Sequence, residues 1–87
     1  MELYKAENAP ADIERIVADL TPHYKERFLR GEIQSYTVKA GYQHMNLFWA
    51  SVEYLPTKDG ERFGPITAHY TILIRNGRIE YQGRGGQ

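Results

Sequence analysis

The chain has 87 residues, with eleven basic and eleven acidic side chains and no cysteine. This length corresponds to a single domain, and the zero net charge removes a general electrostatic attraction to nucleic acid. The absence of cysteine excludes disulfides, a thiolate nucleophile and a cysteine-based zinc site. The sequence contains neither an apolar run of about 20 residues nor a signal-peptide core, so we expect a cytoplasmic protein without a membrane contact.

The N-terminal third predicts a helix over residues 10–30. Asn8 can cap the start of this helix, Pro10 suits its first turn, and Gly31 is a natural stop. Apolar residues recur at helical spacing and predict one core-facing stripe: Ile13, Ile16, Val17, Leu20, Tyr24 and Phe28. Residues 1–6 alternate weakly, and we interpret them as a short edge strand rather than a loose arm.

Thr21 and Pro22 interrupt the helical pattern. A proline inside a helix removes a hydrogen bond and clashes with the preceding turn, at a cost of about 3 kcal/mol. Thr21 can cap a second segment that has Pro22 at its first position. We therefore expect a kinked helix or two abutting helices. Both halves should pack on the same surface, because the apolar stripe continues through the break.

From Glu32 onward the sequence changes to a period of two, which indicates β-strands. The first strand places one set of residues on a single face: Tyr36, Val38 and Ala40. Gly41 is predicted to begin the turn into a central strand over residues 44–54. That strand has two partly apolar faces, with Phe48, Ala50, Val52 and Tyr54 on one and Met45, Leu47, Trp49, Ser51 and Glu53 on the other.

The strongest turn signal is Asn76-Gly77, which is typical of a two-residue type I′ hairpin. This turn joins the third and fourth predicted strands. It pairs Ile74 with Ile79 and Ile72 with Tyr81, so that apolar residues share one face. The hydrophobic pattern and the register therefore agree in this hairpin.

The third strand is predicted over residues 66–75, and parity constrains its register with the central strand. Val52 and Ala68 share a face only if the connection has an odd number of residues or contains a bulge. We expect a three- or five-residue loop around Asp59-Gly60, or a bulge near Gly64-Pro65.

Together these elements predict an α+β domain, in which a kinked N-terminal helix packs on one face of a four- to five-stranded antiparallel sheet. The globular domain is expected over residues 1–83, followed by a flexible tail over residues 84–87. This order of elements resembles the cystatin-like fold, shared by cystatins and, in extended form, by NTF2-like proteins. Gln34 and the Val-Lys-Ala-Gly segment at 38–41 also resemble the Gln-Val-Val-Ala-Gly loop of cystatins. The N-terminal glycine and the Pro-Trp loop of cystatins are missing, so the resemblance implies the fold and not protease inhibition.

The sheet face opposite the helix is the predicted working surface. A sheet covered by a helix on one side usually presents a mostly polar second face to water. Here that face carries an apolar patch, which is typical of an interface. The patch contains Ile33, Met45, Leu47, Trp49 and Leu73, ringed by Thr37, Lys39, Ser51, Thr71 and His69. The alternative is that the N-terminal arm of the same chain covers it.

We therefore predict a non-enzymatic protein-binding module that acts as an inhibitor or adaptor, or forms a homodimer, through this face. Its partner is another protein or a second copy of the chain. Small cysteine-free domains without a catalytic set are typical of such proteins, including phage-encoded inhibitors of bacterial defence systems. The predicted partner-binding residues are Trp49, Leu47, Met45, Leu73, His69 and Ile33.

Catalysis, metal binding and nucleic-acid binding are the alternatives. Glu53 and His69 share the sheet face opposite the helix, as an acid–base pair would, but this is also an ordinary cross-strand contact. The three histidines form no helical metal-binding pair, so no metal or cofactor is predicted. The second interpretation is a nucleic-acid-binding accessory protein that uses Arg75, Arg78 and Arg84 near the Arg-Gly-Gly sequence.

Overall fold

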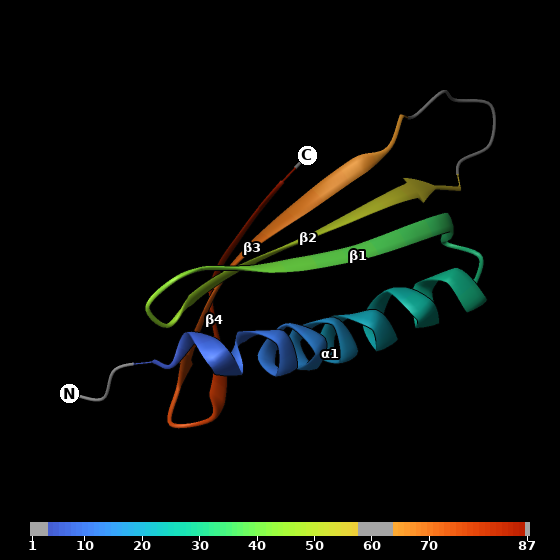
Figure 1. The fold of residues 1–87 in the computed structure, drawn as a ribbon. Helices are drawn as coiled ribbons and strands as arrows, with labels where there is room; N and C mark the ends of the chain where they lie inside the picture. The colour runs from blue at the N-terminus through green and yellow to red at the C-terminus, as the bar shows by residue number, and fades with distance from the viewer. Residues whose placement is uncertain (1–3, 58–63, 87) are drawn as a thin grey trace.

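One helix packs on one face of a four-stranded antiparallel sheet (Figure 1). The computed structural model describes residues 4–57 and 64–86. The strands lie in the sheet in the order of the chain, so each strand pairs with its neighbour in sequence. The predicted α+β class is confirmed. In chain order the elements are the 3₁₀-helix η1 (Ala6–Asn8), α1 (Ala9–Leu29), β1 (Ile33–His44), β2 (Leu47–Pro56), β3 (Ile66–Arg75) and β4 (Arg78–Gly86).

Helix α1 is a single helix that continues through Pro22. Pro22 has no N–H to donate to the carbonyl of Ala18, but Ala18 is exposed, so water can bond that carbonyl instead. The hydroxyl of Thr21 donates a 2.7 Å hydrogen bond to the carbonyl of Val17. Thr21 is therefore a residue inside the helix, and the alternative of two abutting helices is wrong.

The two ends of α1 are built differently. Asn8 occupies the N-cap position, but its side chain makes no capping hydrogen bond. At the other end Gly31 has a φ of 80°. Its N–H bonds the carbonyl of Phe28 at 3.0 Å, and the N–H of Glu32 bonds the carbonyl of Arg27 at 2.9 Å. These two bonds form a Schellman motif, so Gly31 ends the helix as predicted.

The segment before α1 packs on the helix side of the sheet. Of residues 1–6, the first three lie outside the described part, and the rest lead into η1 without forming the predicted edge strand. The ring of Tyr4 lies against Phe48, with 5.3 Å between their centroids. Its hydroxyl donates to the carboxylate of Asp12. This aromatic and polar anchoring holds Tyr4 on the core rather than at a sheet edge.

The hairpin between β3 and β4 is confirmed in type and in register. The two residues of Asn76-Gly77 have φ values of 51° and 75°, and a type I′ turn requires positive φ at both positions. Ile74 pairs with Ile79, and Ile72 pairs with Tyr81.

The predicted parity between β2 and β3 is also confirmed, because Val52 pairs with Ala68. The ladder between these strands runs without a register shift from Leu47 to Tyr54. The parity is therefore set by the connection rather than by a bulge within the strands. The loop expected around Asp59-Gly60 lies outside the described residues.

The turn between β1 and β2 lies later in the chain than predicted. Gly41 does not begin it, because this residue lies inside β1 and pairs with Trp49. Met45 and Asn46 make the turn, and Met45 has a φ of 55°. A methionine in the left-handed region is uncommon, so the sequence carries no signal for a turn at this position.

An irregularity in the β1–β2 ladder changes the position of Ile33. The β1–β2 ladder is irregular between Ile33 and Ser35, which breaks the alternation of side chains. Ile33 consequently lies in the core, where it is 2% exposed, and its predicted place on the opposite face is wrong.

At the C-terminal end, Gly86 still pairs with Ala68. Strand pairing therefore continues past the tail boundary predicted at residue 84.

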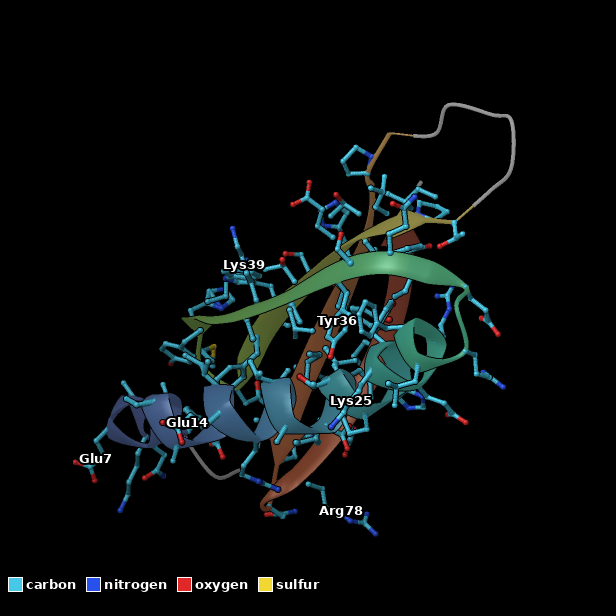
Figure 2. The ribbon with its side chains drawn as sticks, turned by 90° about the vertical axis from the view of Figure 1, so that its right-hand side faces the viewer. Glu7, Glu14, Lys25, Tyr36, Lys39 and Arg78 are labelled. Atoms are coloured by element: carbon cyan, nitrogen blue, oxygen red, sulfur yellow. The ribbon has the colours of Figure 1, made fainter. Side chains whose placement is uncertain are left out.

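The core lies between α1 and the sheet. Figure 2 shows Tyr36 of β1 directed towards α1, whereas Lys39 of the same strand points away from it. Phe28, predicted to belong to the core stripe, is 45% exposed at the end of α1. Its ring still lies against that of Tyr36, with a centroid separation of 6.0 Å. Among the described residues, the buried apolar ones are Ala9, Ile16, Leu20, Tyr24, Ile33, Phe48, Ala50, Val52, Tyr54, Ala68, Ile72 and Ile74.

Candidate functional site

Three apolar side chains lie together on the sheet face turned away from α1, which we call the open face. Leu47 of β2 pairs with Leu73 of β3, and Trp49 follows on the same side of β2. Trp49 is flanked across the strands by Gly41 of β1 and Thr71 of β3. We call Leu47, Trp49 and Leu73 the apolar triad.

The apolar triad is partly accessible and has polar neighbours. Trp49 is 42% exposed, and Leu47 and Leu73 are half-buried. An apolar centre with a polar surround is the usual composition of a protein interface. The polar residues next to the triad in the strand register are Lys39, Ser51, His69, Thr71 and Glu80.

The indole of Trp49 lies over Gly41. A β-carbon built on Gly41 would lie 2.5 Å from Cε2 and Cζ2 and 2.6 Å from Nε1 of the indole. The ring therefore fills the space that a side chain at this position would occupy. Aromatic packing over a glycine stabilises a sheet, and here it also covers one side of the indole.

The structure brings four of the predicted binding residues to the open face. His69 is exposed there beside the apolar triad, opposite Ser51. Met45 belongs to the β1–β2 turn, where it is 57% exposed, so strand parity does not place it on this face. Ile33 belongs to the core. The surface is consequently smaller than predicted and centred on Trp49.

Gly41 and Glu80 lie on the open face, but they were predicted neither in the apolar patch nor among the polar residues around it. A glycine within a strand pattern is a signal for a close approach of another group, and that signal identifies Gly41. Glu80 lies opposite Leu73. Its place follows from the register that Asn76-Gly77 imposes on the hairpin.

In the part of the chain that the structure describes, the N-terminal arm does not cover the apolar triad. Tyr4 contacts the rings of Tyr42 and Phe48 on the helix side of the sheet. Its hydroxyl bond to Asp12 joins it to α1 on that same side. The described part of the arm, from Tyr4 onward, therefore leaves the exposed side of Trp49 accessible.

A hollow adjoins Leu73 where the start of α1 meets the β1–β2 and β3–β4 turns. Met45 and Asp12 also line it. Asp12 is 8% exposed, and its carboxylate accepts hydrogen bonds from Tyr4 and, at 2.9 Å, from Arg15. Burial, and then the bond to Asp12, raises the pKa of the Tyr4 hydroxyl. Asp12 is thus already paired, and these groups stabilise the fold rather than offer a free acid or base.

The backbone positions of the arginines in the nucleic-acid interpretation are spread along the β3–β4 hairpin. Arg75 makes a 2.8 Å salt bridge to Glu80, which compensates its charge. Arg78 pairs with Arg75 across the hairpin, whereas the backbone of Arg84 pairs with Tyr70. Arg84 lies six positions after Arg78 in the extended strand, which corresponds to about 20 Å. The geometry therefore gives this interpretation little support.

Neither the acid–base pair nor a metal cluster weighed from the sequence is assembled among the described residues. Glu53 pairs with Thr67 and His69 pairs with Ser51, so the acid and the imidazole are diagonal neighbours. No hydrogen bond or ion pair joins these two described side chains. Within residues 4–57 and 64–86, no three His, Asp or Glu side chains are grouped to hold a metal ion.

Comparison with known proteins adds no relative: no family model, curated protein or solved structure matches this sequence. The resemblance to the cystatin-like fold therefore stays a prediction that rests on the order of the elements. Among the described residues, no helix has both the length and the apolar character needed to cross a membrane.

Proposed function

We propose that this protein is a non-enzymatic protein-binding module that acts as an inhibitor or adaptor through the open face of its sheet. The observation that carries the proposal is the position of Trp49, which is 42% exposed in the middle of a sheet face. The opposite face of the same sheet already packs against α1 and supplies the core. The open face is therefore free to contact a second molecule.

The composition of the open face favours a protein partner. Interface hot spots are rich in tryptophan and lie near the centre of the contact, inside a ring of less important contacts. Trp49 has this arrangement, since Leu47 and Leu73 adjoin it and polar residues surround them. The partner is another protein or a second copy of this chain.

A nucleic-acid partner is the weaker candidate. Phosphate binding needs several uncompensated cations on one surface. Arg75 is already bonded to Glu80, and the net charge of the chain is zero.

The test compares the association of Trp49→Ala and Leu29→Ala variants with that of the wild type. Leu29 is a matched control, because it is 71% exposed but lies at the end of α1, away from the open face. Light scattering measures self-association, and quantitative affinity capture from a native lysate measures binding to other proteins. Trp49→Ala should weaken association at least about tenfold, as expected for a hot spot, and Leu29→Ala should not.

The proposal fails if Trp49→Ala keeps both the oligomeric state and every captured protein of the wild type. It also fails if Leu29→Ala loses the same association, because the contact would then lie elsewhere. If binding instead depends on Arg75 and Arg78 and weakens steeply with salt, the nucleic-acid alternative replaces it.

A further inference from the structure

Gly41 has no conformational reason to be glycine. Positive φ values among the described glycines occur at Gly31 and Gly77, and Gly41 lies within the regular part of the β1–β2 ladder. Glycine in the interior of a strand weakens it, because it costs more backbone entropy and offers no side chain to pack. The neighbour that requires glycine here is the indole of Trp49, three of whose atoms lie 2.5–2.6 Å from the position of a β-carbon.

Gly83 provides an internal comparison. It belongs to the same row across the sheet, in which Gly41 pairs with Trp49, Trp49 with Thr71 and Thr71 with Gly83. A β-carbon on Gly83 would meet no atom within 4 Å. The indole thus lies over the glycine of β1 and leaves the glycine of β4 uncovered.

We infer that Gly41 is a positioning residue, which fixes the Trp49 indole in the orientation that contacts the partner protein. This inference rests on the proposed function. A long or bulky side chain that is mobile before binding loses conformational freedom when it is immobilised in an interface. An indole already held against the backbone of β1 loses less, so the contact is preorganised. Gly41 therefore acts on binding through Trp49 and need not touch the partner.

The first part of the test uses the fluorescence of Trp49, the single tryptophan of the chain. In Gly41→Ala the new methyl group and the indole cannot occupy the same space, and the indole is the group that can rotate away. Both sides of the ring then meet water. We expect a red shift of the emission and stronger quenching by acrylamide in Gly41→Ala, and neither change in Gly83→Ala. Circular dichroism confirms that both variants are folded.

The second part measures affinity for the protein that wild type retains and Trp49→Ala loses, or for a second copy of the chain if that is the partner. Gly41→Ala should weaken this association about tenfold, as loss of a hot-spot contact does, and Gly83→Ala should leave it unchanged. Adding Gly41→Ala to Trp49→Ala should cause no further loss, because a residue that acts through Trp49 has no effect once the indole is removed.

The outcomes separate this inference from the proposed function. Unchanged fluorescence in Gly41→Ala would overturn the inference, because the ring would not be held by that glycine. A red-shifted emission in Gly41→Ala together with wild-type affinity would also overturn the inference, because Gly41 would then contribute only to the packing of the sheet. If Trp49→Ala itself loses no association, the proposed function fails, and the inference that depends on it fails as well.

Discussion

At the scale of single residues, two tyrosine hydroxyls from other parts of the chain donate hydrogen bonds to carboxylates of α1. Tyr4, before the helix, donates to Asp12, and Tyr81 of β4 donates to Asp19 at 2.5 Å. Burial is the main reason that the pKa of each hydroxyl is raised, and the bond to a carboxylate raises it further. The fold therefore favours the neutral phenol at both positions.

These shifts predict a loss of stability in alkali. The two raised pKa values stabilise the folded state. This stabilisation is complete below pH 10.0, the ordinary pKa of tyrosine, and is lost as the pH rises towards the raised pKa of the folded state. The cause is that the unfolded chain releases these protons first. Urea unfolding between about pH 8 and pH 11 measures this dependence. In a Tyr4→Phe/Tyr81→Phe double variant the free energy of unfolding should depend less on pH over this range. An unchanged pH dependence would show that other groups cause the loss of stability in alkali.

At the scale of elements, the continuity of α1 through Pro22 predicts that this residue weakens the helix. Pro22 is exposed, so replacing it removes no core contact. Pro22→Ala restores a backbone donor and relieves the clash, against a smaller loss from a more flexible unfolded chain. The free energy of unfolding should rise by about 1–2 kcal/mol.

Pro10 is the control for this substitution, because it lies in the first turn of the same helix, where no backbone bond is lost. Pro10→Ala should not stabilise the protein. Denaturant unfolding of both variants makes the comparison. A Pro22→Ala variant no more stable than Pro10→Ala would show that α1 already accommodates its internal proline at little cost.

Much of the fold follows from the sequence where local chemistry and pattern agree. The Asn76-Gly77 turn sets the β3–β4 register, and Gly31 ends α1, because both positions need a positive φ that glycine or asparagine adopts readily. The predictions for the β1–β2 turn and for Ile33 are wrong because the local sequence carries no signal for either. Nothing marks Met45 as a turn residue, and an irregular pairing that displaces Ile33 depends on the facing strand.

For the candidate site, the sequence predicts which face each side chain lies on but not the contacts that the side chain makes. Alternation along β2 and β3 is enough to place Leu47, Trp49 and Leu73 on one face, because side-chain parity does not depend on rotamers. The position of the indole over Gly41 does depend on a rotamer and on the neighbouring strand. Periodicity carries no information on either, so this contact becomes visible only in three dimensions.

At the scale of the whole molecule, β2 separates two roles. Phe48 is fully buried against the helix side, where it contacts the rings of Tyr4 and Tyr42. Trp49, the next residue, lies on the open face and is 42% exposed. One face of the strand holds the fold together, and the other remains accessible. The proposed function requires that these two roles are separable.

The most direct measurement is therefore the free energy of unfolding of Trp49→Ala beside that of Phe48→Ala. Phe48→Ala should lose about 3–5 kcal/mol, because it removes a buried ring and leaves a cavity. Trp49→Ala should lose less than half as much, since it removes a half-exposed side chain that packs on Gly41. An equal loss in the two variants would show that Trp49 is a core residue, and would contradict the open face as the working surface.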